Sequence, residues 1–176
     1  MTALDMFPEA KVDPGVDLDR RYTTRETMDL CMRLAGVDAF DLDVAADEES
    51  HWAPRWFGVE QDGLSQPWTG RVWCNPPYSD IEPWVTKART EMQYPALVWR
   101  IAMLLPCNRT EQPWWQEHVE RWRDGRNHME DINGERVLLD TRFLPTRVKF
   151  GHPGNRDAVG VGSPPFGCVL LVWRRP

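Results

Sequence analysis

The fold is decided by residues 71–105, which read RVWCNPPYSDIEPWVTKARTEMQYPALVWRIAMLL. The first four residues predict a short strand, and a stiff loop, Asn75-Pro76-Pro77-Tyr78, follows it directly. Residues 96–105 form a nearly continuous apolar run, typical of a strand covered on both faces. Between loop and run, apolar residues recur at helical spacing: Ile81, Trp84, Val85, Ala88 and Met92. This alternation of strand and helix indicates an α/β sheet.

Capping residues and apolar patterns extend this arrangement along the chain. Thr23 with Glu26 predicts the start of a helix that Gly36 ends. Asp80 is placed to cap the central helix, with Pro83 in its first turn. A third helix is expected from Thr110 to Gly125, and strands at 40–44, 56–59, 136–139, 147–150 and 167–173. Because strands alone close the chain, we predict a mostly parallel sheet closed by an antiparallel C-terminal hairpin.

The composition is that of a globular protein. The chain has 176 residues, of which 41% are hydrophobic and 27% charged. We expect a loose arm over residues 1–20 and one domain over 21–176. No apolar run approaches the roughly 18 residues of a membrane span, and the acidic N-terminus lacks a signal-peptide pattern. These features predict a cytoplasmic protein without membrane contact.

The charge and the cysteines limit the choice of partners. A net charge of −6 speaks mildly against nucleic acid, but Arg and Lys recur after residue 135, so a local basic face stays open. The four cysteines form no CxxC pair, which disfavours a zinc site or a disulfide framework. No His, Asp and Glu constellation suggests a metal. The ten tryptophans are interpreted mainly as core and groove residues.

The loop Asn75-Pro76-Pro77-Tyr78 is the candidate catalytic element. At the carboxyl end of a parallel strand, it borders the crevice where open α/β sheets bind ligands. An exocyclic amine such as adenine N6 is a poor nucleophile, because its lone pair is delocalised into the ring. Two acceptors on its N–H bonds would free that lone pair, and the Asn75 side-chain oxygen and the Pro76 carbonyl are the natural ones. Tyr78 offers a flat face for an extruded base. The alternative is a simple turn that ends a strand.

The surrounding motifs resemble those of the phage-type DNA N6-adenine methyltransferases. The resemblance covers roughly residues 22–173, and its most specific part is the block from Trp68 to Ser79. It implies a single-domain, Rossmann-like class I methyltransferase that transfers a methyl group from S-adenosylmethionine to adenine N6 in DNA. It also implies a phage- or prophage-encoded protein of a bacterial host cell. The other matching segments are Tyr22-Thr23, Leu42-Asp43-Val44, Asp62-Gly63-Leu64, Trp84–Ala88, Leu104-Leu105-Pro106, Arg109-Thr110 and Val148-Lys149-Phe150.

The same resemblance implies the cofactor-binding residues. Asp43 would lie near the methionine end of the cofactor, Asp62 would contact its adenine, and Tyr22 with Thr23 would line the methionine pocket. After Asp43, Val44-Ala45-Ala46-Asp47 stands where many methyltransferases have a glycine-rich cofactor loop, which the phage-type enzymes also tend to lack. The chain departs from the family pattern at Ser50-His51-Trp52, where the family often has Asn-Ala-Lys, so His51 is interpreted as a surface histidine.

A nucleobase enzyme must also hold phosphate near its pocket. Arg109, at the carboxyl end of the buried strand, and the group Arg142, Arg147 and Lys149 are the candidates for DNA binding. The chain leaves no room for a separate target-recognition domain between the loop and Phe150. We therefore expect a short or relaxed recognition sequence.

Two alternative functions stay open, and a third is set aside. The same loop would suit another planar nitrogen, that of an RNA base or a protein glutamine. An inactive module that only binds cofactor or DNA is a further alternative. Cys107 follows a proline, as the nucleophile of cytosine-C5 methyltransferases does, but no Glu-Asn-Val segment supplies the necessary acid. Cys107 is therefore interpreted as a structural thiol. The oligomeric state is not predicted.

Overall fold

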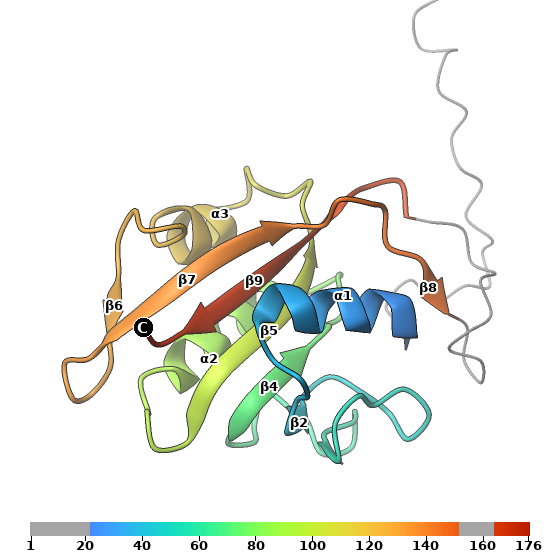
Figure 1. Cartoon of the computed structure of the whole chain (residues 1–176), viewed down its shortest axis with the longest axis horizontal. Coiled ribbons are helices and arrows are strands. Elements are labelled where there is room, and N and C mark those ends of the chain that lie inside the picture. The colour runs from blue at the N-terminus through green and yellow to red at the C-terminus, as the bar shows by residue number, and fades with distance from the viewer. Residues whose placement is uncertain (1–21, 152–163) are drawn as a thin grey trace, which may run out of the picture.

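The computed structural model describes residues 22–151 and 164–176 as an α/β structure (Figure 1). A seven-stranded sheet has the order β3-β2-β4-β5-β9-β7-β6, and β1 pairs with β8 in a two-stranded sheet. The strands are β1 (Tyr22–Thr23), β2 (Leu42–Asp43), β3 (Arg55–Trp56), β4 (Gly70–Cys74), β5 (Val98–Pro106), β6 (Met129–Glu130), β7 (Arg136–Phe143), β8 (Phe150–Gly151) and β9 (Cys168–Arg174). The helices are α1 (Arg25–Ala35), α2 (Glu82–Glu91) and α3 (Pro113–Trp115), which continues as a π-helical turn, Gln116–Glu120.

The large sheet is half parallel and half antiparallel, which corrects the expectation of a mostly parallel sheet. Strands β3, β2, β4 and β5 run parallel, whereas β9 is antiparallel to both β5 and β7, and β6 is antiparallel to β7. Residues 168–173 of β9 are all buried, so this strand takes an interior place covered on both faces. Strands β7 and β9 form no simple hairpin, because β8 lies between them in the chain and pairs with β1.

Helix α1 begins later than the capping box predicted. Thr24 is its N-cap and accepts a hydrogen bond from the Thr27 amide at 3.4 Å, whereas Thr23 belongs to β1. Gly36 ends the helix in the left-handed conformation, at φ 67°, as expected. Helix α1 lies across one face of the sheet, and α2 and α3 lie across the other (Figure 1). The side chains that α1 buries are Thr27, Met28, Cys31 and Ala35.

The central strand–loop–helix–strand prediction is confirmed. Strand β4 leads into the loop, Pro83 stands in the first turn of α2, and β5 covers most of the predicted apolar run. The N-cap of α2 is Ile81 and not Asp80, and it makes no side-chain capping bond. All five apolar side chains of the predicted helical face are buried: Ile81, Trp84, Val85, Ala88 and Met92.

The third predicted helix is shorter than expected. It begins at Pro113, with Gln112 as its N-cap, and ends in the π-helical turn at Glu120. Trp115 and Val119 are buried as predicted, but His118 and Trp122 are only partly buried. Trp122 instead lies under the guanidinium groups of two arginines, Arg89 at 4.5 Å and Arg121 at 5.2 Å.

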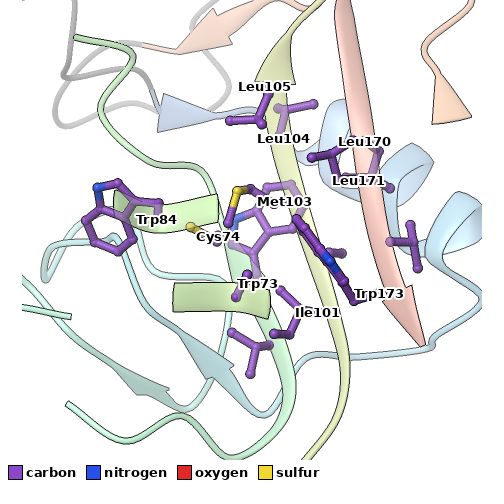
Figure 2. Packing of buried hydrophobic residues seen from close by; sticks show 14 of the residues in the cluster. Trp73, Cys74, Trp84, Ile101, Met103, Leu104, Leu105, Leu170, Leu171 and Trp173 are labelled. Carbon is purple, nitrogen blue, oxygen red and sulfur yellow. The ribbon is translucent and has the colours of Figure 1, made fainter. Parts of the chain in front are cut away.

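The hydrophobic core is centred on β5 and β9. Figure 2 shows Met103, Leu104 and Leu105 of β5 beside side chains of β9, all of them buried: Leu170, Leu171 and Trp173. Trp73 and Cys74 extend the core onto β4, directly before the loop. The last residues of β4 are thus fixed in the core, which gives the loop at Asn75 a rigid base.

Candidate active site

A cavity of about 330 Å³ opens beside the ends of β2, β3 and β4. Because these strands are parallel, the loops that follow them share one edge of the sheet, where open α/β sheets bind ligands. The volume falls within the roughly 300–1,000 Å³ that small-molecule sites have. The cavity is lined by Tyr22, Val44, Ala45, Ala46, Asp47, Ser50, Phe57, Gly58, Val59, Asp62, Gly63, Asn75, Pro77 and Trp84.

The loop after β4 places Asn75 and Pro77 on the cavity wall, while Pro76 is buried. The Asn75 side chain is held from the side of β1, because its Nδ2 donates a hydrogen bond to Thr23 Oγ1 at 3.3 Å. Thr23 itself is buried and does not line the cavity. The structure thus places Thr23, which the resemblance assigned to the methionine pocket, against the predicted catalytic amide.

Tyr78 is buried and does not line the cavity, with 6% of its surface exposed. Its ring meets the Phe150 ring nearly edge-on, with centroids 6.3 Å apart, and tilts against the Phe166 ring at 6.2 Å. The sequence predicted an open face for base stacking. In the structure this ring instead belongs to an aromatic cluster of Tyr78, Phe150 and Phe166 beside the loop.

Asp43 lies at the end of β2, and its carboxylate shapes the adjoining loop. It is 2% exposed, accepts a hydrogen bond from the Trp52 amide at 3.0 Å and another from the Ala45 amide at 3.4 Å, and does not line the cavity. Burial, and secondly the Asp43 charge, raise the pKa of Cys74 well above its ordinary value, so the thiol before Asn75 stays protonated.

Asp47 is the carboxylate that lines the cavity beyond β2, and sequence reasoning missed it. Tyr22, which was predicted, donates a hydrogen bond from its hydroxyl to Asp47 Oδ2 at 2.7 Å. Partial burial by itself raises the pKa of Asp47, but hydrogen bonds from Tyr22, Ser50 and the Glu49 amide outweigh it and hold this pKa below its ordinary value. The only sequence signal was an acid in the loop four residues after Asp43.

Asp62 lines the cavity from the loop after β3, as its predicted role requires. It is exposed, adopts the left-handed conformation at φ 52°, and accepts a hydrogen bond from the Leu64 amide at 3.2 Å. The next residue, Gly63, passes so close to the residue that follows β2 that a Cβ would lie 2.0 Å from the Val44 carbonyl oxygen. The Gly63 carbonyl accepts a hydrogen bond from the Trp68 indole at 2.8 Å, which fixes this loop against the core.

Three apolar side chains complete the cavity wall: Phe57, Val59 and Trp84. Val59 stands at the open side with 98% of its surface exposed. Trp84 was predicted as a core residue of α2, and it stacks on Trp68 with centroids 6.5 Å apart. The cavity therefore combines an aromatic, apolar wall with carboxylates and one amide.

The segment Ser50-His51-Trp52, where the chain departs from the family pattern, is tied to the site. The Trp52 indole donates a hydrogen bond to the Thr23 carbonyl at 3.2 Å, and the Arg25 guanidinium lies 5.3 Å from the Trp52 ring centre. His51, expected at the surface, is half-buried and stacks on Trp56 with centroids 5.6 Å apart.

The candidate DNA-binding residues lie around the same edge of the sheet. Arg109 follows β5, which is parallel to β4, so it leaves the sheet on the side of the Asn75 loop. Arg147 and Lys149 are exposed in the segment that leads into β8, the partner of β1. Arg142 is also exposed, but it forms an ion pair with Asp140 at 3.2 Å.

Cys107 lies outside the cavity lining and packs against Gly167, whose added Cβ would lie 3.1 Å from its Sγ. Within residues 22–151 and 164–176, no group of three or more His, Cys, Asp or Glu side chains is arranged to hold a metal ion. In that same part of the chain, no helix has the length and apolar character needed to cross a membrane.

Comparison with known proteins identifies the family. The family described as DNA N-6-adenine-methyltransferase (Dam) matches residues 25–138. A DNA N-6-adenine-methyltransferase of Escherichia phage T1 is 35% identical over 145 residues, which cover 77% of this chain and 55% of the phage protein. The chain thus spans about half the length of this curated relative. Because the family match includes β2, β4 and the Asn75 loop, the chain belongs to the Dam family of DNA N-6-adenine-methyltransferases.

Proposed function

We propose that this chain transfers a methyl group from S-adenosylmethionine to the N6 amine of adenine in DNA. The observation that carries the proposal is that Asn75 lines the same cavity as Tyr22, Asp47 and Asp62. One site therefore holds an acceptor for the substrate amine, from Asn75, and carboxylates that can accept from the cofactor's amino group and ribose hydroxyls. Membership of the Dam family supports this reaction.

The fold in this proposal is a Rossmann-like class I methyltransferase domain over residues 21–176, preceded by an arm over residues 1–20, which lies outside the described residues. Four neighbouring parallel strands with helices on both faces support the assignment (Figure 1). Asp47, Asp62 and Asn75 follow β2, β3 and β4 respectively, so all three lie at one edge of the sheet.

The residues of the cavity fit S-adenosylmethionine. Asp47, kept ionised by Tyr22 and its neighbours, would accept from the amino group, and Asp62 would accept from the adenosine part. The wall of Phe57, Val59 and Trp84 would cover the apolar faces of the ligand. Asp43 would act from behind, by holding the loop that carries Asp47. The cofactor supplies an electrophilic methyl group.

The chain's own part in the reaction is to prepare the amine. Two hydrogen bonds from the N6 amine, one to Asn75 Oδ1 and one to the Pro76 carbonyl, would draw the nitrogen toward sp³ geometry and localise its lone pair. Both acceptors sit on a loop whose two prolines restrict its backbone and whose preceding strand is buried over its last three residues. The acceptors are therefore oriented before the substrate arrives, which lowers the reorganisation that the reaction needs.

The DNA is proposed to lie across the edge that carries Arg109, Arg147 and Lys149, with an adenine turned out of the stack toward Asn75. Phosphate contacts from these cations would offset the acidic net charge of the chain. Tyr78 would support the base pocket from behind, through the aromatic cluster that it forms with Phe150 and Phe166.

The test offers isotopically labelled S-adenosylmethionine with DNA, RNA and a glutamine-containing peptide in parallel. The proposal requires label in DNA, and on adenine. Label that appears only in RNA, or only in the peptide, would show that DNA is not the substrate. Cofactor binding without transfer to any of the three would indicate an inactive binding module.

A further inference from the structure

We propose that Thr23 is a positioning residue that fixes the orientation of the Asn75 side-chain amide, and that the Trp52 indole holds Thr23 in place for this purpose. The inference rests on the proposed function of Asn75 as the acceptor for the substrate amine. It assigns a role to Thr23 that differs from the cofactor contact implied by the family resemblance.

The contact itself defines which end of the amide is engaged. Asn75 Nδ2 donates to Thr23 Oγ1 at 3.3 Å, and Thr23 is only 3% exposed. Because a carboxamide carries its donor and its acceptor on opposite sides, a bond to the nitrogen turns the oxygen away from Thr23. A half-turn of the amide would instead present N–H donors to a substrate amine that also offers N–H donors. With the Thr23 hydroxyl acting as the acceptor, as it does here, the amide is held in the orientation that suits the reaction.

Strand geometry separates Thr23 from its neighbour Tyr22. Successive side chains of a strand point to opposite faces, and β1 consists of these two residues. Tyr22 lines the cavity and reaches Asp47, whereas Thr23 lies outside the cavity lining and reaches Asn75. One strand of two residues therefore serves the cofactor side of the site with one residue and the catalytic loop with the other.

Thr23 is held from two sides. Its carbonyl accepts a hydrogen bond from the Trp52 indole at 3.2 Å, and the Trp52 amide is in turn bonded to Asp43 Oδ2 at 3.0 Å. Across the small sheet Thr23 pairs with Phe150, whose ring lies against Tyr78. The strands β1 and β8 thus contact both ends of the catalytic loop, Asn75 through Thr23 and Tyr78 through Phe150.

The experiment compares Thr23→Val, which keeps the shape and removes the hydroxyl, with Thr23→Ser, which restores it. The matched control is Thr27→Val, because the Thr27 hydroxyl is bonded to the Thr24 side chain at 3.0 Å and not to the loop. Thr23→Val is expected to lower kcat for methyl transfer about tenfold and to leave cofactor affinity in calorimetry within about twofold. Thr23→Ser should recover most of kcat, and Thr27→Val should keep it.

A second measurement reads the contact without any turnover. The side-chain amide signals of Asn75 in ¹⁵N–¹H spectra, assigned through Asn75→Ala, are expected to shift in Thr23→Val and in Trp52→Phe, which removes the indole donor but keeps an aromatic ring. They should stay in place in Thr27→Val. An unshifted Asn75 amide in Thr23→Val, or a loss of cofactor affinity with unchanged kcat, would overturn the inference. A wild-type chain that methylates no DNA would contradict the proposed function instead, and the amide signals would still decide the contact.

Discussion

The Tyr22 hydroxyl donates a 2.7 Å hydrogen bond to the Asp47 carboxylate, linking residues that are 25 positions apart in the chain. The bond joins β1 to the loop after β2, and both residues line the cavity. It closes one side of the candidate cofactor site. It also helps to keep Asp47 charged, because a hydrogen bond to the ionised form favours that form.

Asp47→Asn should weaken S-adenosylmethionine binding about 10- to 100-fold, because a charged acceptor is replaced by a neutral amide. Tyr22→Phe should weaken it by less than about tenfold, since the carboxylate remains and only its orientation is lost. Titration calorimetry measures both effects. The matched control is Glu48→Gln, an exposed acid one residue further along that does not line the cavity. Wild-type affinity in Asp47→Asn would remove this residue from the site.

The depressed pKa of Asp47 also predicts a pH dependence of stability. Because its folded-state pKa lies below the unfolded value of about 3.9, its contribution is fully present above that pH. The contribution is lost as the pH falls through the lower, folded-state value. In urea titrations the stability gap between wild type and Asp47→Asn should therefore be constant from pH 7 to about pH 5 and should shrink below about pH 4. A gap that widens on acidification would contradict the direction of this shift.

Gly63→Ala should destabilise the fold by at least about 3 kcal/mol, because the new methyl group would meet the Val44 carbonyl oxygen at 2.0 Å. The displaced loop would also spoil the cavity, so cofactor affinity should fall with stability. Gly134→Ala is the control, since its φ of 77° would strain an alanine but nothing lies close to an added Cβ, and only about 1 kcal/mol is expected there. Thermal unfolding and calorimetry test the pair, and equal effects in both variants would refute the packing argument.

Asp43→Asn should lower stability by about 2 kcal/mol, because it weakens hydrogen bonds to a buried, charged acceptor. If Asp43 acts by holding the loop, the variant should lose cofactor affinity together with order in residues 45–52, visible as faster amide hydrogen exchange there. A variant with wild-type exchange but weaker cofactor binding would instead support the direct contact that the family resemblance implied.

The double variant Arg147→Ala/Lys149→Ala should weaken DNA binding and flatten its dependence on salt, by about one unit of slope for each DNA phosphate that the variant no longer binds. Cofactor affinity should not change. Arg136→Ala is the control. Arg136 is also exposed, but it stands at the start of β7, whereas the site lies toward the other end of that strand, which Leu144 follows. Fluorescence anisotropy across a salt series measures these slopes, and a normal slope in the double variant would exclude this surface.

The central part of the fold could be predicted from the sequence because its signals are local. The apolar spacing in α2, the buried run of β5 and the glycine that ends α1 each specify their own element. The mixed character of the sheet could not be predicted in the same way. It depends on β9 inserting between β5 and β7, a long-range pairing that no local pattern in residues 167–173 encodes.

The site shows the same division. Asn75 and Asp62 lie in recognisable motifs and line the cavity. The roles of Thr23 and Asp43 in the structure depend instead on hydrogen bonds across the fold. Thr23 bonds to Asn75, which is far away in the sequence, and Asp43 bonds to Trp52, which lies in no recognisable motif. Asp47 has no motif of its own, and its place on the cavity follows only from the Tyr22 bond and the course of the loop.

The most direct test of the account is nucleoside mass spectrometry of DNA incubated with the chain and S-adenosylmethionine that carries a deuterated methyl group. Wild type is predicted to produce labelled N6-methyladenine, and Asn75→Ala is predicted to produce it at least roughly 100-fold more slowly while it binds the cofactor normally. Label on another base, or an undiminished rate of N6-methyladenine formation in Asn75→Ala, would contradict the claim that the chain methylates adenine N6 by means of Asn75.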